Sequence, residues 1–184
     1  VNDALVDGSQ PSTITVSVVD ASSDNAFDPL ADQTVAVTTT DNDAAGFTVT
    51  GGPLTVDESG TTGTFTVVLD AQPLTDVVFN VTSSDPGEAT AAPATLTFTN
   101  ATWNLPQTVT VTGVADGIAD GNQNSTITVS VDVAGSDGAF DTLPDQSVDV
   151  TTTDNAGAVP ALVQAGRPGG DRAAVVRIAD RGPQ

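Results

Sequence analysis

Most of the chain alternates apolar and polar residues at every second position, and Thr, Val and Ala dominate these segments. A period of two predicts β-strands that turn one face toward a core and a threonine-rich face toward water. Turn residues (Gly, Pro, Asn and Asp) separate the segments, and helical periodicity is hard to find. The expected strands are 47–50, 64–69, 76–81, 95–99, 108–112, 125–131 and 147–151. The pattern predicts an all-β protein built as an antiparallel β-sandwich of about seven strands.

The sequence also repeats itself with a period of 113 residues. Residues 1–43 align without a gap with residues 114–156, and 28 of these 43 positions are identical. Such a period is about the size of one domain and too long for a solenoid repeat. We therefore expect the C-terminal part of one copy at 1–43, a complete immunoglobulin-like copy at 44–156 and a non-repeat segment at 157–184. A tandem organisation favours a structural or binding array over a single active site.

The two flanking segments lack the features of a closed domain. Residues 1–43 supply about three strands without their sheet partners, so we expect them to be poorly ordered or imperfectly docked. Residues 157–184 abandon the repeat and are rich in Gly, Pro and Arg, which is typical of a flexible tail, although 173–178 could form a short strand. Trp103 is the only tryptophan. It is expected to cap one end of the core, and stacking on a sugar is the alternative.

The charge of the chain limits the classes of molecule that it can bind. The formal net charge is −20, and the four basic residues all lie in the tail at Arg167, Arg172, Arg177 and Arg181. Residues 1–156 contain 22 of the 24 acidic residues and no Lys or Arg. This distribution argues against nucleic acid and anionic membrane surfaces as partners, and no segment is apolar enough to insert into a membrane. Bulk salt or bound divalent cations must neutralise the repeat.

The missing residue types argue against catalysis. Cys, His, Met and Tyr are absent, which excludes disulfides and zinc sites of the usual Cys/His type. Without His, Cys or Lys in the repeat, pairs of nucleophile and base are unavailable. Only a mechanism with paired carboxylates would remain, and a unit of this size offers little room for a substrate cleft. We expect that the protein is not an enzyme.

Several acidic residues fall at strand ends or in turns. They are Glu58, Asp85, Asp116, Asp120 and Asp154. In an up-and-down sandwich, alternate turns gather at one end, so these carboxylates can converge. Ca²⁺ binds six to eight hard oxygen ligands from carboxylates, carbonyls and water. The alternative is adaptation to high salt, with hydrated carboxylates and no specific site; Asp132 and Asp149, on strand exteriors, fit that interpretation.

The repeat resembles the Calx-β domain, the calcium-binding sandwich of sodium–calcium exchangers, and in particular the divergent copies in large bacterial surface and secreted proteins. The matching stretches cover 44–156 and read VDESGTTGTFTVVLD, TSSDPGEATAAPATLTFTNATWNLPQTVTV, VADGIADGNQ and VTTTDN. The resemblance implies calcium ligands at Glu58, Asp85, Asp116, the carbonyl of Ile118, Asp120, Asp154 and, as a weaker match, Asn155. The equivalent positions in the partial copy are Asp3, Leu5, Asp7, Asp41, Asn42 and Asp43.

The sequence departs from the family pattern in ways that reduce its charge. Ala115, Gly117 and Gln123 stand where the exchanger type has acidic residues, and the closing acidic triplet is reduced to Asp154. Fewer carboxylates imply fewer ions or weaker binding, in the range of about 10⁻⁴–10⁻³ M that extracellular modules show. The partial copy also lacks counterparts of Glu58 and Asp85, so a complete site is not expected there.

These observations predict a calcium-binding structural repeat of a large bacterial adhesin-like protein, on the cell surface or secreted, that Ca²⁺ stiffens at the pole between repeats. Its partners would be neighbouring repeats of the same chain and a host-surface or matrix ligand. One alternative is a carbohydrate- or protein-binding module of a surface protein. Another is a regulatory calcium sensor within a membrane transporter, as the exchanger resemblance implies.

Overall fold

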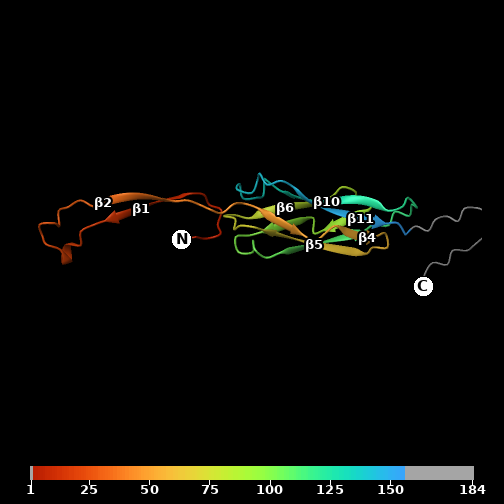
Figure 1. Cartoon of the computed structure of the whole chain (residues 1–184), viewed down its shortest axis with the longest axis horizontal. Coiled ribbons are helices and arrows are strands. Elements are labelled where there is room, and N and C mark those ends of the chain that lie inside the picture. The colour runs from red at the N-terminus through yellow and green to blue at the C-terminus, as the bar shows by residue number, and fades with distance from the viewer. Residues whose placement is uncertain (1, 156–184) are drawn as a thin grey trace, which may run out of the picture.

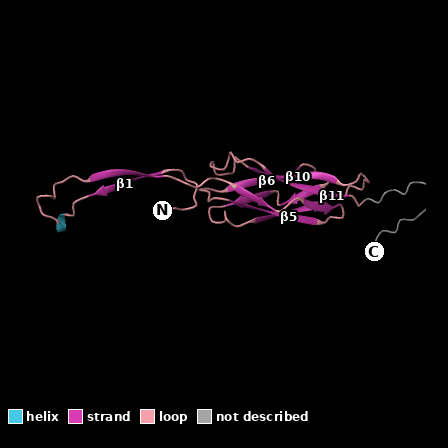
Figure 2. Cartoon of the chain, in the orientation of Figure 1, coloured by secondary structure: helices cyan, strands magenta, loops and turns pink. Residues whose placement is uncertain are grey.

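The computed structural model describes residues 2–155, which form a β-sandwich over residues 47–153 and a hairpin that projects from one end of it (Figure 1). Strands and loops make up almost all of this part, with one short 3₁₀ turn, η1 (Asp20–Ser22), at the tip of the hairpin (Figure 2). No helix in the described part has the length and apolar character needed to cross a membrane. The all-β prediction is confirmed. The predicted tail lies outside the described residues.

The sandwich consists of two sheets. The five-stranded sheet has the order β4-β11-β10-β6-β8, and the four-stranded sheet has the order β3-β5-β9-β7. The strands are β3 (Phe47–Thr50), β4 (Leu54–Asp57), β5 (Thr62–Leu69), β6 (Val77–Ser83), β7 (Ala89–Ala92), β8 (Thr95–Phe98), β9 (Gln107–Gly113), β10 (Gln123–Val131) and β11 (Gln146–Thr153).

The core lies between the inner faces of the two sheets, as the alternating pattern predicts. In β5, Phe65, Val67 and Leu69 are buried while the intervening residues are partly or fully exposed. Aromatic rings join the sheets: Phe47 lies 4.6 Å from Phe79, measured between ring centroids. Each fully buried side chain of this size contributes about 1.5–3 kcal/mol. The β-sandwich fold is therefore stabilised by the apolar side chains on the inner face of each strand.

Two short strands were missed by the sequence pattern, so the sandwich has nine strands over residues 47–153 and not about seven. These strands, β4 and β7, have four residues each. β4 follows Pro53 directly, and Ala92 at the end of β7 precedes Pro93. Four residues beside a proline give too little alternation for the period of two to be recognised.

The order of the strands corrects the up-and-down expectation. Neighbouring strands in each sheet are mostly not consecutive in sequence, because the chain crosses between the sheets repeatedly. Most pairs are antiparallel as predicted, but β4 pairs with β11 in parallel, with Leu54 opposite Val150. This parallel pairing brings the end of β4 beside the end of β11.

The partial first copy forms a two-stranded hairpin of β1 (Gln10–Val16) and β2 (Gln33–Thr39). Its strands pair over seven residues, but they have no third strand or second sheet within the described residues. Almost every residue of the two strands is exposed. The hairpin thus extends away from the sandwich with both faces in solvent (Figure 1).

A short segment before the hairpin docks on the sandwich. Leu5 forms a parallel bridge with Gln72, which lies between β5 and β6. The Gln72 amide donates to the carbonyl of Ala4 at 2.7 Å, and the Val6 amide donates to the carbonyl of Gln72 at 2.9 Å. Val6 also packs against the core. Trp103 is half-buried against the core too, as the interpretation of this residue as an end cap predicts.

Candidate metal site at the acidic pole

The turns that follow β4, β6, β9 and β11 lie at the end of the sandwich opposite the hairpin, which we call the acidic pole (Figure 1). Glu58 follows β4, Asp154 follows β11, and Asp116 and Asp120 lie in the connection between β9 and β10. Asp85 lies in the turn between β6 and β7. The pole therefore collects acidic residues from both sheets, as the sequence predicts, although the strand order is not the one expected.

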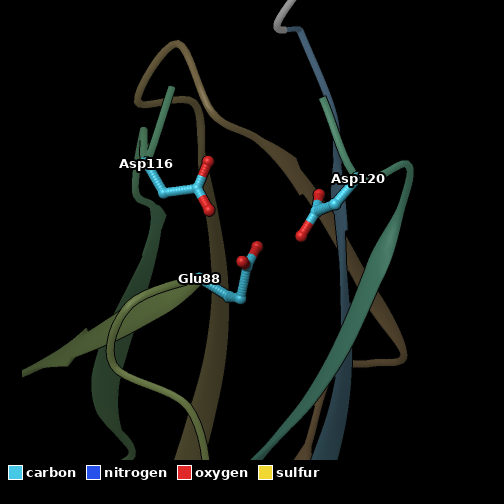
Figure 3. A group of neighbouring side chains, drawn as sticks. All are labelled: Glu88, Asp116 and Asp120. Atoms are coloured by element: carbon cyan, nitrogen blue, oxygen red, sulfur yellow. The ribbon is translucent and has the colours of Figure 1, made fainter. Parts of the chain in front are cut away.

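Three carboxylates at this pole converge closely. One carboxylate oxygen each from Glu88, Asp116 and Asp120 lies within 4.8 Å of the other two. Glu88 lies before β7, and Asp116 and Asp120 lie in the connection between β9 and β10; the three side chains point toward a shared space (Figure 3). We call this group the carboxylate cluster. Within the described residues it is the one group of three or more such side chains arranged closely enough to share an ion.

Glu88 is the buried member of the carboxylate cluster. Its side chain is 8% exposed, whereas Asp116 and Asp120 are exposed. The Glu88 Oε2 atom is buried and has no hydrogen-bond partner among the described residues. Burial raises the pKa of Glu88 above its ordinary value, and neighbouring negative charges raise it further: Asp116, Asp120, Asp85 and Glu58. A buried carboxylate without a hydrogen-bond donor, among like charges, is costly unless a proton or a cation joins it.

The backbone around Glu88 holds its side chain in this position. The carbonyl of Asp85 accepts hydrogen bonds from the amides of Glu88 and Ala89, at 3.2 and 3.0 Å, which closes the turn. The carbonyl of Glu88 accepts from the Val114 amide at 2.8 Å and from the Thr152 hydroxyl at 3.2 Å. Because Val114 follows β9 and Thr152 belongs to β11, Glu88 is fixed between the two sheets.

The connection that carries Asp116 and Asp120 is also shaped locally. Asp116 accepts a hydrogen bond from the Ile118 amide at 2.7 Å, and Asp154 accepts one from the Gly121 amide at 2.9 Å. Gly121 has a φ of +80°, a conformation that favours glycine. At the start of the connection, a Cβ on Gly113 would overlap the backbone of Asp57, so glycine permits the close approach of β9 and β4.

The predicted ligands differ in how closely they approach the cluster. Asp116 and Asp120 belong to it. Glu58 and Asp85 lie near enough to raise the pKa of Glu88 but are not members of the group of three. Glu58 is buried and accepts a hydrogen bond from the amide of Asn155 at 3.4 Å.

The other three predicted ligands lie around the cluster. Ile118 is exposed, and its amide is committed to Asp116. Asp154 orients the connection through Gly121, and Asn155 contributes its amide to Glu58. Whether any of the seven predicted residues is a ligand stays a prediction.

Glu88 is the residue that sequence reasoning missed. The sequence does not predict Glu88 as a ligand, because the four-residue strand β7 that follows it has too little alternation to be recognised. One signal was available: Glu58 and Glu88 are the only two glutamates among the 22 acidic residues of the repeats. A glutamate side chain is longer than an aspartate side chain. Glu88, whose backbone is anchored between the sheets, can therefore reach the connection between β9 and β10 that holds Asp116 and Asp120.

The partial copy repeats the local geometry without the cluster. The Leu5 amide donates to Asp3 at 3.2 Å, and the Gly8 amide donates to Asp41 at 2.8 Å, matching the bonds of Ile118 and Gly121. A hydrogen bond from the Asp43 amide is the largest of the contributions that lower the pKa of Asp41. Asp3, Asp7, Asp41, Asn42 and Asp43 line one small pocket there. No residue equivalent to Glu88 joins them within the described residues.

The residues at the acidic pole have the chemistry that could hold a hard cation. Every side-chain atom of the carboxylate cluster that could bind a metal is an oxygen. The repeat contains no basic side chain to neutralise the charge of the cluster. All-oxygen sets with flexible loops suit Ca²⁺, whereas soft transition metals prefer sulfur and nitrogen. The residues present fit the cation that the sequence predicted.

Comparison with known proteins leaves the chain without an assigned family. No family model matches it, and no curated protein matches it. Among solved structures it is similar to domains 4 and 5 of the S-layer protein SbsC (TM-score 0.47, 21% identity, 78% of this chain). This chain spans 58% of that one. It is also similar to the E. coli chaperone DraB, with a TM-score of 0.42 and 8% identity over 61% of this chain and 57% of DraB.

Proposed function

We propose that residues 44–156 are a calcium-binding structural repeat of a Calx-β-like tandem array in a large bacterial cell-surface or secreted protein. The observation that carries the calcium assignment is the Glu88 carboxylate, which is buried, has one oxygen without a hydrogen-bond partner in the described part of the chain, and faces two further carboxylates. The tandem repeat supports the assignment as a structural array, and the absence of basic residues from 1–156 supports a need for bound cations.

The spacing of the oxygens fits one shared ion. Calcium binds oxygen at about 2.3–2.6 Å, so two ligands of the same ion can lie up to about 5 Å apart. The oxygens of the carboxylate cluster meet this limit. Without a cation these charges repel one another; with one, the same charges become ligands. Asp85 and Glu58, whose charges also act on Glu88, are further candidates for the six to eight ligands, together with Asp154, the carbonyl of Ile118 and water.

The ion would link segments that are far apart in sequence. Glu88 precedes β7 of one sheet, while the connection with Asp116 and Asp120 leads from β9 of that sheet into β10 of the other. Because the cluster exists only when these segments are folded together, the ion binds the folded state and stabilises it. The role is mechanical and not catalytic: a stiff spacer that remains folded where calcium is available.

The test compares unfolding of the full chain in Ca²⁺, in Mg²⁺ and in chelator, followed by the fluorescence of Trp103. At a calcium concentration of 100 times Kd the free energy of unfolding should rise by about 2.7 kcal/mol. Glu88→Gln removes the buried charge at nearly constant shape and should abolish most of this rise. Asp149→Asn is the matched control, because Asp149 is exposed on β11. An identical midpoint in calcium and in chelator would contradict the proposal.

A carbohydrate- or protein-binding module has less support. Trp103, the residue proposed for stacking, packs against the core, and its carbonyl accepts a hydrogen bond from the Leu69 amide at 3.2 Å. The position of Trp103 is explained by its packing against the core. A glycan array with the full chain separates the two functions, since the spacer role predicts no bound glycan.

A further inference from the structure

The hairpin β1–β2, taken with its loop as residues 10–39, carries apolar side chains that nothing covers in the described part of the chain. Ile14 and Val35 lie opposite each other in the strand register, and both are 56% exposed. Five large apolar side chains of the hairpin are more than half exposed: Ile14, Val16, Phe27, Leu30 and Val35. Exposed apolar side chains that lie together mark interaction surfaces. This face is therefore a candidate surface for binding another polypeptide.

The sandwich shows what kind of polypeptide fits such a face. After the 113-residue shift, the counterparts of the five side chains belong to the core or pack against it: Ile127, Val129, Phe140, Leu143 and Val148. β6 and β4 pair with the edges of β10–β11, and the four-stranded sheet covers the inner face. All of these covering strands lie within residues 44–113, which we call the acceptor segment.

The polar contacts that fix β10–β11 on the acceptor segment are also available to the hairpin. Four side chains make these hydrogen bonds: Ser136 to Val78, Asp137 to Leu74 and Thr75, Gln146 to Phe47, and Thr152 to Glu88. The residues at the equivalent positions of the hairpin are identical: Ser23, Asp24, Gln33 and Thr39. The strand register is the same too, since Ile14 lies opposite Val35 and Ile127 lies opposite Val148.

We propose that the hairpin β1–β2 is a strand-exchange surface whose partner is the acceptor segment of a second molecule of this chain. There the hairpin takes the place of β10–β11, so that β1 pairs with β6 of the second molecule and β2 pairs with its β4. Such a domain swap needs no new kind of interface, because every contact is one that the sandwich already makes.

The partner is a second molecule because the hairpin is held away from its own acceptor segment. Ala4–Val6, just before the hairpin, is paired with the backbone of Gln72, and the hairpin projects from the end of the sandwich opposite the acidic pole (Figure 1). In the exchanged position Thr39 takes the place of Thr152, whose hydroxyl bonds to Glu88 at the acidic pole. A second molecule can receive the projecting hairpin while the bonds to Gln72 stay intact.

The tether of β10–β11 decides when the exchange takes place. Residues 114–122 join β9 to β10, so the resident pair acts at an effective concentration of about 1 mM. At about 10 µM protein, a hairpin of equal intrinsic affinity would occupy about one acceptor segment in a hundred. Truncation of a buried isoleucine in the resident pair weakens that pair about 30-fold or more. The exchanged form then becomes as common as the resident form or more common.

The experiment uses the full chain with Ile127→Ala, which weakens the resident pair and leaves the hairpin intact. Sedimentation should show dimers or longer oligomers whose share rises with protein concentration, at least tenfold above that of the wild type at about 10 µM. Adding Ile14→Asp, which places a charge on the apolar face of the hairpin, should abolish them. Thr15→Asp is the matched control, because neighbouring residues of a strand point to opposite faces.

The comparison is independent of the calcium assignment, because all of these variants keep the carboxylate cluster and are measured both in Ca²⁺ and in chelator. Oligomers that Ile14→Asp removes and Thr15→Asp preserves support the exchange. If Ile127→Ala does not fold, Val129→Ala, which removes fewer buried atoms, replaces it. Monomers at every concentration overturn the proposal. So does equal oligomerisation of the wild type and Ile127→Ala, because hairpins that bind one another would not depend on the resident pair.

Discussion

The hairpin β1–β2 and the strand pair β10–β11 have nearly the same sequence and the same pairing, yet their side chains have opposite environments. Gln10 pairs with Thr39 in the hairpin, and Gln123 pairs with Thr152 in the sandwich, which is the same register after the 113-residue shift. Ile14 is 56% exposed, whereas its counterpart Ile127 is completely buried. Strand pairing is therefore a local property of this sequence, and burial is not.

The two regions differ in whether further strands pair with them and cover them. In the sandwich, β10 also pairs with β6, and β11 also pairs with β4. The second sheet then covers their inner face. The hairpin has neither neighbour within the described residues. A two-stranded hairpin is marginal in water, and three or more strands with a covered face are needed for independent stability. Matched substitutions in the two regions measure this difference directly.

The largest effect is expected at the phenylalanines of the two loops that join these strands. Phe140 is completely buried, while the equivalent Phe27 is 57% exposed. Phe140→Ala should lower the free energy of unfolding by about 3–5 kcal/mol, because it leaves a cavity in the core. Phe27→Ala should change it by less than about 0.5 kcal/mol. Urea titrations followed by Trp103 fluorescence report on the sandwich in both cases. Similar losses for both variants would mean that the hairpin is part of the same cooperative core.

A smaller difference is expected at Asp137 and its counterpart Asp24. Burial alone would raise the pKa of Asp137, but hydrogen bonds from the amides of Ala139, Thr75 and Leu74 outweigh burial and lower it. Asp24 is exposed and accepts a hydrogen bond from Ala26. Asp137→Asn should cost about 1–3 kcal/mol near neutral pH, and Asp24→Asn should leave the Trp103 transition unchanged.

The effect of Asp137 depends on pH with a definite sign. A lowered pKa means that the ionised carboxylate stabilises the folded state above the ordinary pKa of Asp, and that this contribution disappears as the pH falls through the folded-state pKa. The difference between wild type and Asp137→Asn should therefore shrink on acidification. A difference that grows toward acid would contradict the hydrogen-bonding account.

The smallest effect is expected at the two glycines with positive φ. An added Cβ meets no atom within 4 Å at either Gly8 or Gly121, so only backbone strain separates glycine from alanine. Gly121→Ala should lower the stability of the sandwich by about 1 kcal/mol, while Gly8→Ala should not shift the Trp103 transition. Loss of stability at both positions would show that the hairpin and the sandwich unfold together.

The sequence predicted the long strands, such as β5 and β10, and also the four-residue strands β3 and β8. It missed β4 and β7, whose four residues lie beside prolines, and it misjudged the strand order because crossings between sheets leave no trace in local alternation. At the acidic pole it predicted Asp116 and Asp120 from turn positions and family resemblance. It missed Glu88, because the role of that residue depends on β7 and on contacts with Val114 and Thr152 from segments far away in the chain.

By itself, the sequence determined the all-β class, the repeat, the face that each long strand turns inward and a negative charge without basic partners in the repeats. These features follow from local periodicity and composition, so they are the same in both copies. Only the tertiary structure decided which carboxylates meet and which strands cover the core of the complete copy. Burial and the repulsion between like charges depend on segments that are distant in sequence but adjacent in space, and residues 44–156 bring those segments together.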